Sequence, residues 1–351
     1  MKALVFNGPR EIRYEDYPDP PLASPNSAIL KVTKSSICGS DLHIYNGEQV
    51  MATHYTKDVE KFCVGHEFIG EVAEVGPDVH GFNVGDRVLS SAGTGCGNCV
   101  ACRTGRPMPC AKGARAFGLS TELNGGQAQY VCVPNADRTL LPIPPGVSEE
   151  QAVLLTDAMA TAYFGVRNAD IKTGSTVAVI GLGPIGLIAV ELSLLLGASR
   201  VIAVDPVASR RARAAALGAE ALDVTPGTAA EIFNRVGGRG VPSVIEASGA
   251  SAAIELAESV VGGLGTLSII GVPQAVSTIS AIGIFYRNLT VRSGMAPVPT
   301  LWPDLIPLVQ QGRLKAEGIF THTFPLSEGA EAYRLFDSRQ DNVVKVMINV
   351  P

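Results

Sequence analysis

Four of the seven cysteines fall within fifteen residues, in the run CGNCVACRTGRPMPC, with the spacing C-x2-C-x2-C-x7-C. Four thiolates on one loop can complete the tetrahedral coordination that zinc prefers, and glycines in and beside the run let the backbone wrap around an ion. An iron–sulfur cluster is an alternative, although its usual pattern has three residues before the last cysteine. A second alternative is that the four cysteines are reduced and bind no metal. We predict a structural zinc site formed by Cys96, Cys99, Cys102 and Cys110.

A second group of possible metal ligands is dispersed along the chain. Cys38 stands where a strand gives way to a helix, a position that favours the thiolate. His66 and Glu67 head an apolar strand, and Asp157 is an acid inside the apolar run LLTDAMATAYF. Each also has an ordinary explanation, because Cys38 and His66 could be core residues and Asp157 a helix cap. The residues alone leave this second site open.

A glycine-rich loop follows the predicted strand 176–180, and a helix follows the loop. In this context the pattern G-x-G-x-x-G is typical of dinucleotide binding. The first glycine makes a tight turn, the second lets the backbone approach the pyrophosphate, and the third lets helix and strand pack closely. A glycine-rich turn without a ligand is the alternative. The predicted cofactor residues here are Gly181, Gly183, Pro184, Ile185 and Gly186.

An acidic residue, Asp205, closes the next predicted strand, nineteen residues after Gly186. A carboxylate at this position can accept hydrogen bonds from the adenosine ribose hydroxyls of NAD, and it repels a 2′-phosphate. Arg210 and Arg211 follow closely and could bind such a phosphate. We predict NAD as the cofactor rather than NADP.

Two kinds of domain are needed to position these residues. Up to about residue 150, short strands are separated by Gly, Pro, Asn and Asp. After the Pro-rich run LPIPPGVS, strands alternate with helices, which indicates parallel βαβ units. The chain closes with VVKVMINV, a strand that we expect to rejoin the first domain. The predicted fold is α/β, with a β-rich domain over residues 1–150 and 292–351 and a Rossmann doubly wound parallel sheet over 151–291.

Composition excludes several other classes of protein. A chain of 351 residues with 46% hydrophobic and 17% charged residues has room for about two domains and is not disordered. The net charge of −5, without a Lys/Arg block, argues against nucleic-acid and anionic-membrane surfaces. The apolar stretch 177–198 is long enough to span a membrane, but its glycines and proline predict a strand, a turn and a helix. The N-terminus lacks a signal-peptide segment, so we expect a cytoplasmic protein.

The stretch GHEFIGEVAEVGPDV is similar to the zinc signature of the zinc-containing alcohol dehydrogenases of the medium-chain dehydrogenase/reductase family. The resemblance continues through CGSDLH, the four-cysteine lobe, GLGPIG and the closing strand, so it covers essentially the whole chain. It implies a GroES-like catalytic domain. It also implies hydride transfer between an alcohol and a nicotinamide cofactor, helped by zinc, which lowers the pKa of the alcohol.

The resemblance also assigns ligands. It implies that Cys38, His66 and Asp157 hold the catalytic zinc, with Glu67 as an intermittent ligand or a partner of the ligands. Many members have cysteine at the third position, and aspartate there resembles the bacterial secondary-alcohol and formaldehyde-type branches. Cys63, three residues before His66, is interpreted as a buried thiol. Two zinc ions per chain are therefore expected.

Other roles implied by the resemblance concern the proton and the cofactor. Ser40 would take the alcohol proton, and His43 would pass it to solvent through the cofactor ribose. A helix cap for Ser40 and an exposed helix residue for His43 are the alternatives. Lys345 resembles the position that reaches the pyrophosphate, although an ordinary strand lysine would look the same. Val272 and Met295 resemble the positions where backbone groups bind nicotinamide.

The expected substrate is a secondary alcohol or its ketone, with formaldehyde, polyol, diol and threonine dehydrogenases as alternatives within the family. A zinc-free quinone or enoyl reductase would lack both metal sets. A catalytically silent dinucleotide-binding protein is the alternative outside enzymes. We expect a homotetramer or homodimer that acts on small-molecule alcohols, ketones or aldehydes, with no nucleic-acid or membrane partner.

Overall fold

The computed structural model describes all residues except 51, 52, 57 and 274. The chain divides into two compact units, which are described separately. Unit 1 comprises Met1–Ala160, Pro297–Gln310 and Phe320–Pro351, and unit 2 comprises Thr161–Ala296 and Gln311–Ile319. This division assigns residues 151–160 to unit 1, and residues 292–296 and 311–319 to unit 2. Residues 151–156 belong to unit 1 because α4 (Glu149–Thr156) packs against β7 and β8 of that unit.

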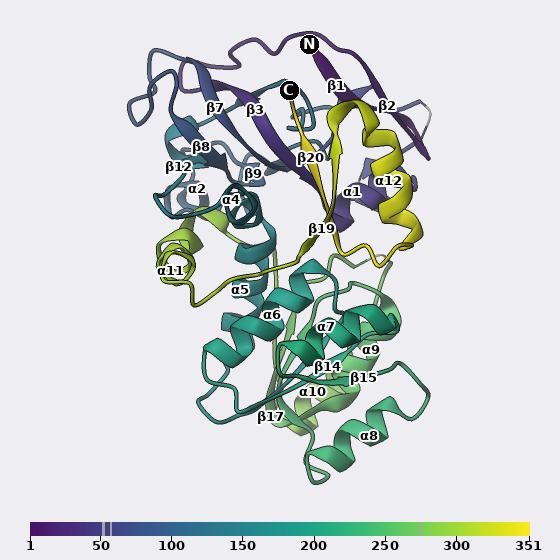
Figure 1. The fold of residues 1–351 in the computed structure, drawn as a ribbon. Coiled ribbons are helices and arrows are strands. Elements are labelled where there is room, and N and C mark those ends of the chain that lie inside the picture. Colours follow the sequence, from purple (N-terminus) through teal and green to yellow (C-terminus); the bar gives the residue numbers. More distant parts are fainter. Residues whose placement is uncertain (51–52, 57, 274) are drawn as a thin grey trace. The chain divides into compact units, whose positions relative to one another are not determined.

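Unit 1 is built on a seven-stranded sheet in the order β12-β8-β7-β3-β20-β19, with β11 also paired to β3. Its strands are β3 (Ala28–Ile37), β7 (Glu67–Val75), β8 (Arg87–Ser90), β11 (Tyr130–Val133), β12 (Leu140–Pro142), β19 (Phe320–Pro325) and β20 (Lys345–Asn349). The C-terminal strand β20 pairs antiparallel with β3 and parallel with β19. The end of the chain therefore returns to the sheet that contains its first third (Figure 1).

Smaller elements complete unit 1. A three-stranded sheet has the order β2-β1-β6, and β9 pairs with β10. The strands are β1 (Lys2–Gly8), β2 (Glu11–Asp16), β4 (Gln49–Val50), β5 (Thr53–His54), β6 (Phe62–Cys63), β9 (Gly93–Thr94) and β10 (Arg115–Ala116). The helices are α1 (Gly39–Tyr45), α2 (Val100–Arg103), α3 (Ala136–Thr139), α4, α11 (Val298–Gln310), the 3₁₀ turn η1 (Leu326–Glu328) and α12 (Gly329–Ser338), and α5 (Ala158–Asn168) leads into unit 2.

Unit 2 is a six-stranded, all-parallel sheet in the order β15-β14-β13-β16-β17-β18. The order reverses at β13, which lies between β14 and β16, so this is the predicted doubly wound Rossmann arrangement. The strands are β13 (Thr176–Ile180), β14 (Arg200–Val204), β15 (Glu220–Leu222), β16 (Val241–Glu246), β17 (Val261–Ile269) and β18 (Thr290–Ser293). The helices are α6 (Pro184–Leu195), α7 (Ala208–Ala216), α8 (Thr228–Arg235), α9 (Ser251–Val260) and α10 (Ala281–Arg287).

Burial follows the sequence patterns that predicted these strands. In β13 and β14 four consecutive residues are buried, as expected for parallel strands covered by helices on both faces. The apolar stretch 177–198 forms β13, the glycine loop and α6. Of the helices described, none is both long enough and apolar enough to cross a membrane.

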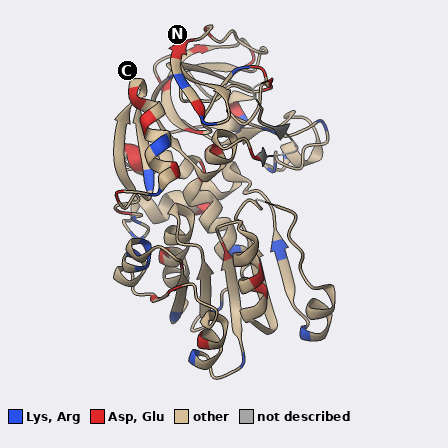
Figure 2. Ribbon diagram, turned by 90° about the vertical axis from the view of Figure 1, so that its right-hand side faces the viewer, with Lys and Arg blue, Asp and Glu red and all other residues tan. Residues whose placement is uncertain are grey.

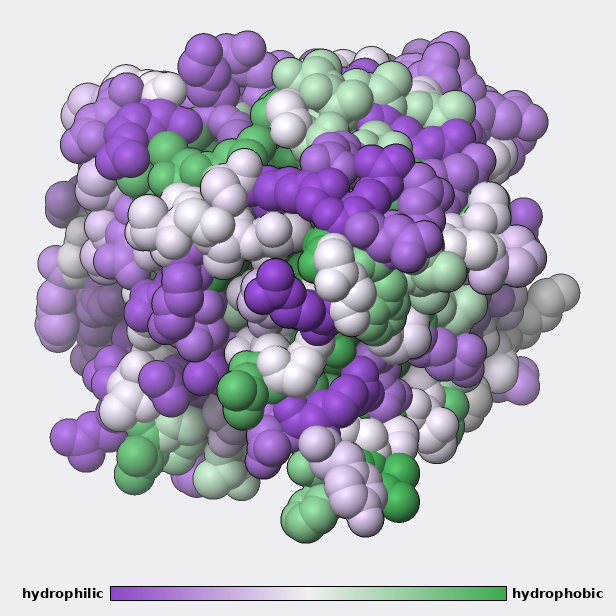
Figure 3. All heavy atoms as spheres, turned by 90° about the horizontal axis from the view of Figure 1, so that it is seen from below, coloured by the Kyte–Doolittle hydropathy of each residue, from purple (hydrophilic) through white to green (hydrophobic). Residues whose placement is uncertain are grey.

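Charged residues of both signs are interspersed along the ribbon (Figure 2). The face drawn in Figure 3 is dominated by hydrophilic and intermediate residues, with hydrophobic residues scattered among them in small patches.

Candidate active site and metal centres

The four cysteines of the lobe converge. The Sγ–Sγ distances are 4.0 Å for Cys96–Cys102, 3.5 Å for Cys99–Cys102 and 3.9 Å for Cys99–Cys110. A regular tetrahedron with Zn–S bonds of about 2.3 Å has sulfur separations of about 3.8 Å. Backbone N–H groups point at the sulfurs, and those of Cys102 and Ala111 lower the pKa of Cys99 to about 6. The lobe is therefore shaped for one tetrahedral ion.

A second cluster joins residues that are far apart in the sequence. Single ligand atoms of Cys38, His66, Glu67 and Asp157 lie within 4.8 Å of one another. Asp157 Oδ2 is 3.4 Å from His66 Nε2 and 3.8 Å from Cys38 Sγ. The structure thus brings together the dispersed ligands that the sequence could not connect on its own.

The elements of unit 1 explain this convergence. Cys38 is the N-cap of α1, where β3 ends, and His66 directly precedes β7, the neighbour of β3 in the sheet. Asp157 is the residue between α4 and α5. Because α4 packs on β7 and β8, its last turn brings Asp157 to the cluster.

Asp41 contacts two residues of the cluster, and the sequence analysis did not single it out. Its Oδ2 accepts a hydrogen bond of 2.9 Å from the Cys38 N–H, in a capping box at the start of α1. Its Oδ1 lies 3.2 Å from His66 Nδ1, an ion-pair contact whose angles fall outside those of a hydrogen bond. A carboxylate behind a ligating histidine orients the ring and fixes its tautomer. The signal was present as an acid three residues after Cys38, the capping-box spacing.

These carboxylates also control the protonation of His66. Burial by itself lowers the pKa of His66, but Asp41 and Asp157 outweigh burial and raise that pKa well above its usual value. Without a cation at the cluster these carboxylates therefore favour the protonated form of the ring. A metal ion would take the place of that proton at Nε2.

Glu67 is fully buried and is held by two groups. Its Oε2 lies 2.5 Å from Lys345 Nζ and accepts a hydrogen bond from the Ser36 hydroxyl. Its Oε1 is buried without a hydrogen-bond partner among the described residues. An orphaned carboxylate oxygen beside a thiol, an imidazole and a second carboxylate fits a zinc ion as the missing partner.

Lys345, which the resemblance implies reaches the pyrophosphate, lies at the start of β20 in unit 1. Its side chain is only 1% exposed, and its ammonium pairs with Glu67. Burial lowers the pKa of Lys345, but the Glu67 carboxylate outweighs this effect and raises the pKa, so the ammonium keeps its proton. The ammonium therefore lies beside the carboxylate of the Cys38–His66–Glu67–Asp157 cluster, and its role toward a pyrophosphate stays a prediction.

The remaining residues expected in unit 1 are placed as follows. Ser40 occupies the second position of α1, whose N-cap is Cys38, so Ser40 does not cap this helix. His43 lies one turn from Ser40 and is largely buried, with Nδ1 2.5 Å from Glu48 Oε2. Cys63 is a buried thiol in β6, outside the cluster, and burial raises its pKa to about 12.

In unit 2 the glycine loop connects β13 to α6. Gly181 has a φ of +90°, which favours glycine, and a Cβ on Gly186 would lie 1.8 Å from the Gly181 carbonyl oxygen. A Cβ on Gly183 would meet nothing within 4 Å. Gly183 is the N-cap of α6, Pro184 is the first helical residue and Ile185 the next. The loop thus has the open, glycine-lined helix N-terminus that suits a pyrophosphate.

Asp205 directly follows β14 and is 4% exposed. Its Oδ2 accepts a 2.7 Å hydrogen bond from the Leu182 N–H of the glycine loop, and its Oδ1 accepts one of 2.8 Å from the Val207 N–H. Arg210 Nη1 is 3.9 Å from Oδ2. The carboxylate is therefore fixed beside the loop. Val272 and Met295 lie elsewhere in unit 2 and are 42% and 48% exposed.

Comparisons with known proteins agree with this geometry. Residues 24–145 match the family model of the alcohol dehydrogenase GroES-like domain, and residues 184–311 match that of the zinc-binding dehydrogenases. A probable zinc-binding alcohol dehydrogenase of Mycobacterium tuberculosis is 43% identical over 335 residues, which cover 95% of this chain and 84% of the relative.

Solved structures are similar over the full length. An alcohol dehydrogenase of Thermus sp. ATN1, TADH, superposes with a TM-score of 0.91 at 32% identity and covers 100% of both chains. A putative zinc-binding dehydrogenase of Sinorhizobium meliloti, solved with NADP bound, has a TM-score of 0.82 at 28% identity and covers 99% of this chain and 98% of its own.

The GroES-like unit, the Rossmann unit and the donor cluster define a zinc-type dehydrogenase of the medium-chain dehydrogenase/reductase family. The chain belongs to the zinc-type alcohol dehydrogenases of that family and is an oxidoreductase that acts on a small-molecule substrate.

Proposed function

We propose that the chain catalyses reversible hydride transfer between a secondary alcohol and NAD, and that it binds one catalytic and one structural zinc ion. The observation that carries this proposal is the convergence of Cys38, His66 and Asp157. Three protein ligands leave a fourth tetrahedral position for a substrate, whereas the four lobe cysteines fill all positions. Zinc at the three-ligand cluster supplies Lewis acidity that lowers the pKa of an alcohol hydroxyl.

The chain's own residues prepare that ligand set. Asp41 orients the His66 ring, so that Nε2 faces Asp157 and Cys38. The thiolate of Cys38 and the carboxylate of Asp157 contribute two negative charges against a divalent cation. Glu67 is neutralised by Lys345, and its unpartnered Oε1 is available as an additional oxygen ligand.

A proton path starts at α1. The Ser40 hydroxyl, two residues after Cys38, takes the proton released by the alcohol as it gives up its own proton toward His43. His43 lies one helical turn further, and the Glu48 carboxylate at Nδ1 favours the tautomer with a proton on that nitrogen. Nε2 is then the acceptor that can receive a proton and pass it to solvent.

The proposed cofactor is NAD, bound by the glycine loop and Asp205. The fixed carboxylate of Asp205 is suited to accept hydrogen bonds from ribose hydroxyls, and its charge opposes a 2′-phosphate. The NADP in the Sinorhizobium relative makes cofactor preference a necessary part of the test.

The proposal is tested by a dehydrogenation screen with 2-propanol, a vicinal diol, a polyol, L-threonine and formaldehyde, each with NAD and with NADP. We expect the highest kcat/KM with the secondary alcohol, and a preference for NAD of at least ~10-fold. Reduction of neither cofactor by any of these substrates would contradict the activity. A higher kcat/KM for threonine, a polyol or formaldehyde would contradict the substrate class, and a preference for NADP would contradict the cofactor.

We further propose a cytoplasmic homodimer or homotetramer. A lobe of four thiolates requires a reducing compartment. In unit 2 β18 is an edge strand, and α10, which precedes it in the chain, carries the apolar residues Ile282, Phe285 and Tyr286, exposed to 68%, 76% and 76%. Sedimentation equilibrium should give a mass two or four times that of the chain, and a monomer would contradict this part of the proposal.

A further inference from the structure

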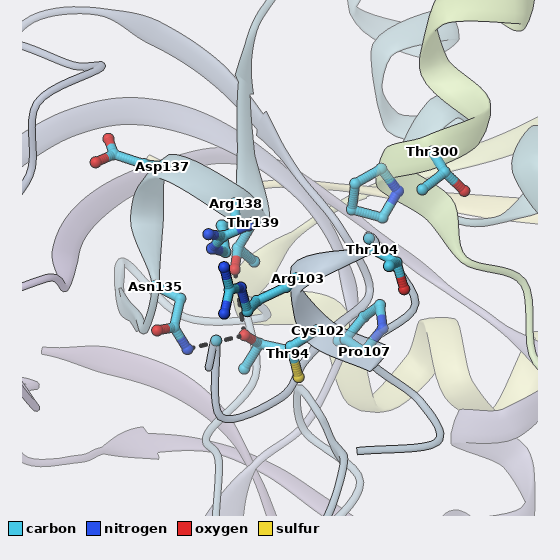
Figure 4. A pocket seen from close by; sticks show the side chains of 14 residues that line it. Thr94, Cys102, Arg103, Thr104, Pro107, Asn135, Asp137, Arg138, Thr139 and Thr300 are labelled. Atoms are coloured by element: carbon cyan, nitrogen blue, oxygen red, sulfur yellow. Dashed lines mark hydrogen bonds between the residues drawn. The ribbon is translucent and has the colours of Figure 1, made fainter. Parts of the chain in front are cut away.

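Unit 1 contains a cavity of about 380 Å³ that the proposed reaction does not use. It lies between the cysteine lobe, α3 and the start of α11, and no residue of the Cys38 cluster lines it (Figure 4). The lobe and α11 approach closely here, because Gly105 has a φ of +74° and a Cβ on it would lie 2.3 Å from Thr300 Cγ2.

Two arginines line this cavity, Arg103 from the end of α2 and Arg138 from α3. Figure 4 draws both side chains in the lining of the cavity, and both arginines are exposed at the surface. Within the described part of the chain, neither guanidinium donates a hydrogen bond or pairs with a carboxylate. The lining carboxylate, Asp137, is used otherwise, because it accepts hydrogen bonds from the N–H groups of His80 and Gly81 at 3.1 and 2.8 Å.

The neutral donors around the cavity are also used within the protein. The hydroxyls of Thr104, Thr139 and Thr300 donate to backbone carbonyls at 3.0, 2.9 and 2.8 Å. The Asn135 amide donates to the Gly95 carbonyl at 2.8 Å. The side-chain donors that remain for a ligand are therefore the two guanidinium groups, each with five N–H bonds. Such a site selects a ligand with several acceptor oxygens and negative charge.

We propose that this cavity binds a phosphate group, either as inorganic phosphate or as the phosphomonoester of a small metabolite. A carboxylate satisfies one guanidinium fork, whereas a tetrahedral dianion can accept paired hydrogen bonds from two. A volume of about 380 Å³ is in the range of small-molecule sites and exceeds what a phosphate ion fills. The bound group would connect α2 of the lobe to α3 and thereby stabilise the lobe.

The test uses the zinc-loaded enzyme saturated with NADH, so that the dinucleotide site is occupied and does not take up phosphate. Binding of inorganic phosphate and of glycerol 3-phosphate is measured by isothermal titration calorimetry at constant ionic strength, with chloride as the reference anion. We expect one site per chain for both ligands and an upward shift of the thermal midpoint. Tighter binding of the ester identifies a phosphorylated metabolite as the natural ligand, and equal or tighter binding of phosphate identifies the inorganic ion.

Arg103→Gln and Arg138→Gln should each weaken phosphate binding at least tenfold and remove most of the thermal shift. Arg106→Gln is the matched control, because Arg106 is an exposed arginine of the same lobe that does not line the cavity. It should bind phosphate like the wild type.

Three results of the binding measurements would overturn the proposal. They are no phosphate binding by the wild-type enzyme, equal binding by the Arg138→Gln variant, or the same loss in the Arg106→Gln variant. The thermal midpoint of Arg103→Gln offers a fourth check. If it falls below that of the wild type by the same amount with and without phosphate, the proposal is overturned, because Arg103 would then stabilise the lobe without a bound phosphate.

Discussion

Replacing Asp157 with asparagine distinguishes a zinc ligand from a helix cap. Asparagine keeps the shape of the side chain and caps helices as well as aspartate, so a cap predicts almost no effect. The ligand role predicts a large one, because Asp157 Oδ2 lies 3.4 Å from His66 Nε2 and 3.8 Å from Cys38 Sγ, where one ion can contact all three. Removing this charge should lower kcat by at least about 100-fold, which corresponds to about 2.7 kcal/mol in the barrier.

The assay combines steady-state kinetics of the purified variant with its zinc content by elemental analysis. The expected result is weaker retention of the catalytic zinc, with the lobe zinc unchanged as an internal control. Circular dichroism and NADH binding should match the wild type, because the fold does not depend on this charge. Full activity together with two zinc ions per chain in Asp157→Asn would refute the ligand assignment.

Three further predictions address the lobe, the cofactor and the ligand partner. Cys99→Ser should lose the lobe zinc and lower the thermal midpoint while the Cys38 cluster keeps its zinc, and a variant with two zinc ions and unchanged stability would contradict a structural site. Asp205→Gly should narrow or reverse the NAD preference of at least ~10-fold, measured as kcat/KM for both cofactors, and an unchanged preference would remove Asp205 from cofactor selection. In zinc-free protein His66 has a raised pKa, so zinc affinity should increase with pH until that pKa is passed and then level off. Asp41→Asn should move this rise to lower pH in zinc titrations, and a pH profile identical to that of the wild type would contradict the Asp41–His66 contact.

The sequence predicted best those features that depend on neighbouring residues. The strand, the three glycines and the helix around Gly181 have a local geometric cause, and the structure has β13, the glycine loop and α6 in that order. The lobe cysteines are likewise close in sequence, so their spacing alone predicted that they would converge.

The second metal cluster was harder to predict because its ligands come from three separate segments. Only packing of α4 on the sheet brings Asp157 to Cys38 and His66, and no local pattern contains that information. The resemblance to a known family supplied the connection. The same packing explains why α4 belongs to unit 1, although the pattern of short strands gives way to alternating strands and helices just before it.

Some contacts could not be predicted because the partner of a side chain lies on a distant element. The pairing of β20 with β3 brings the Lys345 ammonium next to Glu67 at the start of β7, a contact that no local pattern contains. Asp41 was overlooked because an acid in the first turn of a helix has an ordinary explanation as part of a capping box. Its second contact, with His66, is visible only in three dimensions.

The most direct test of the central claim, a catalytic zinc held at the Cys38–His66–Asp157 cluster, is the turnover and zinc content of His66→Ala, measured side by side with the wild type. For the wild type we predict NADH formation from NAD and a secondary alcohol, with two zinc ions per chain. For His66→Ala we predict no detectable turnover, one zinc ion per chain and unchanged NADH binding, because the Rossmann unit and the lobe do not involve this residue. Near-normal turnover by His66→Ala would contradict the account.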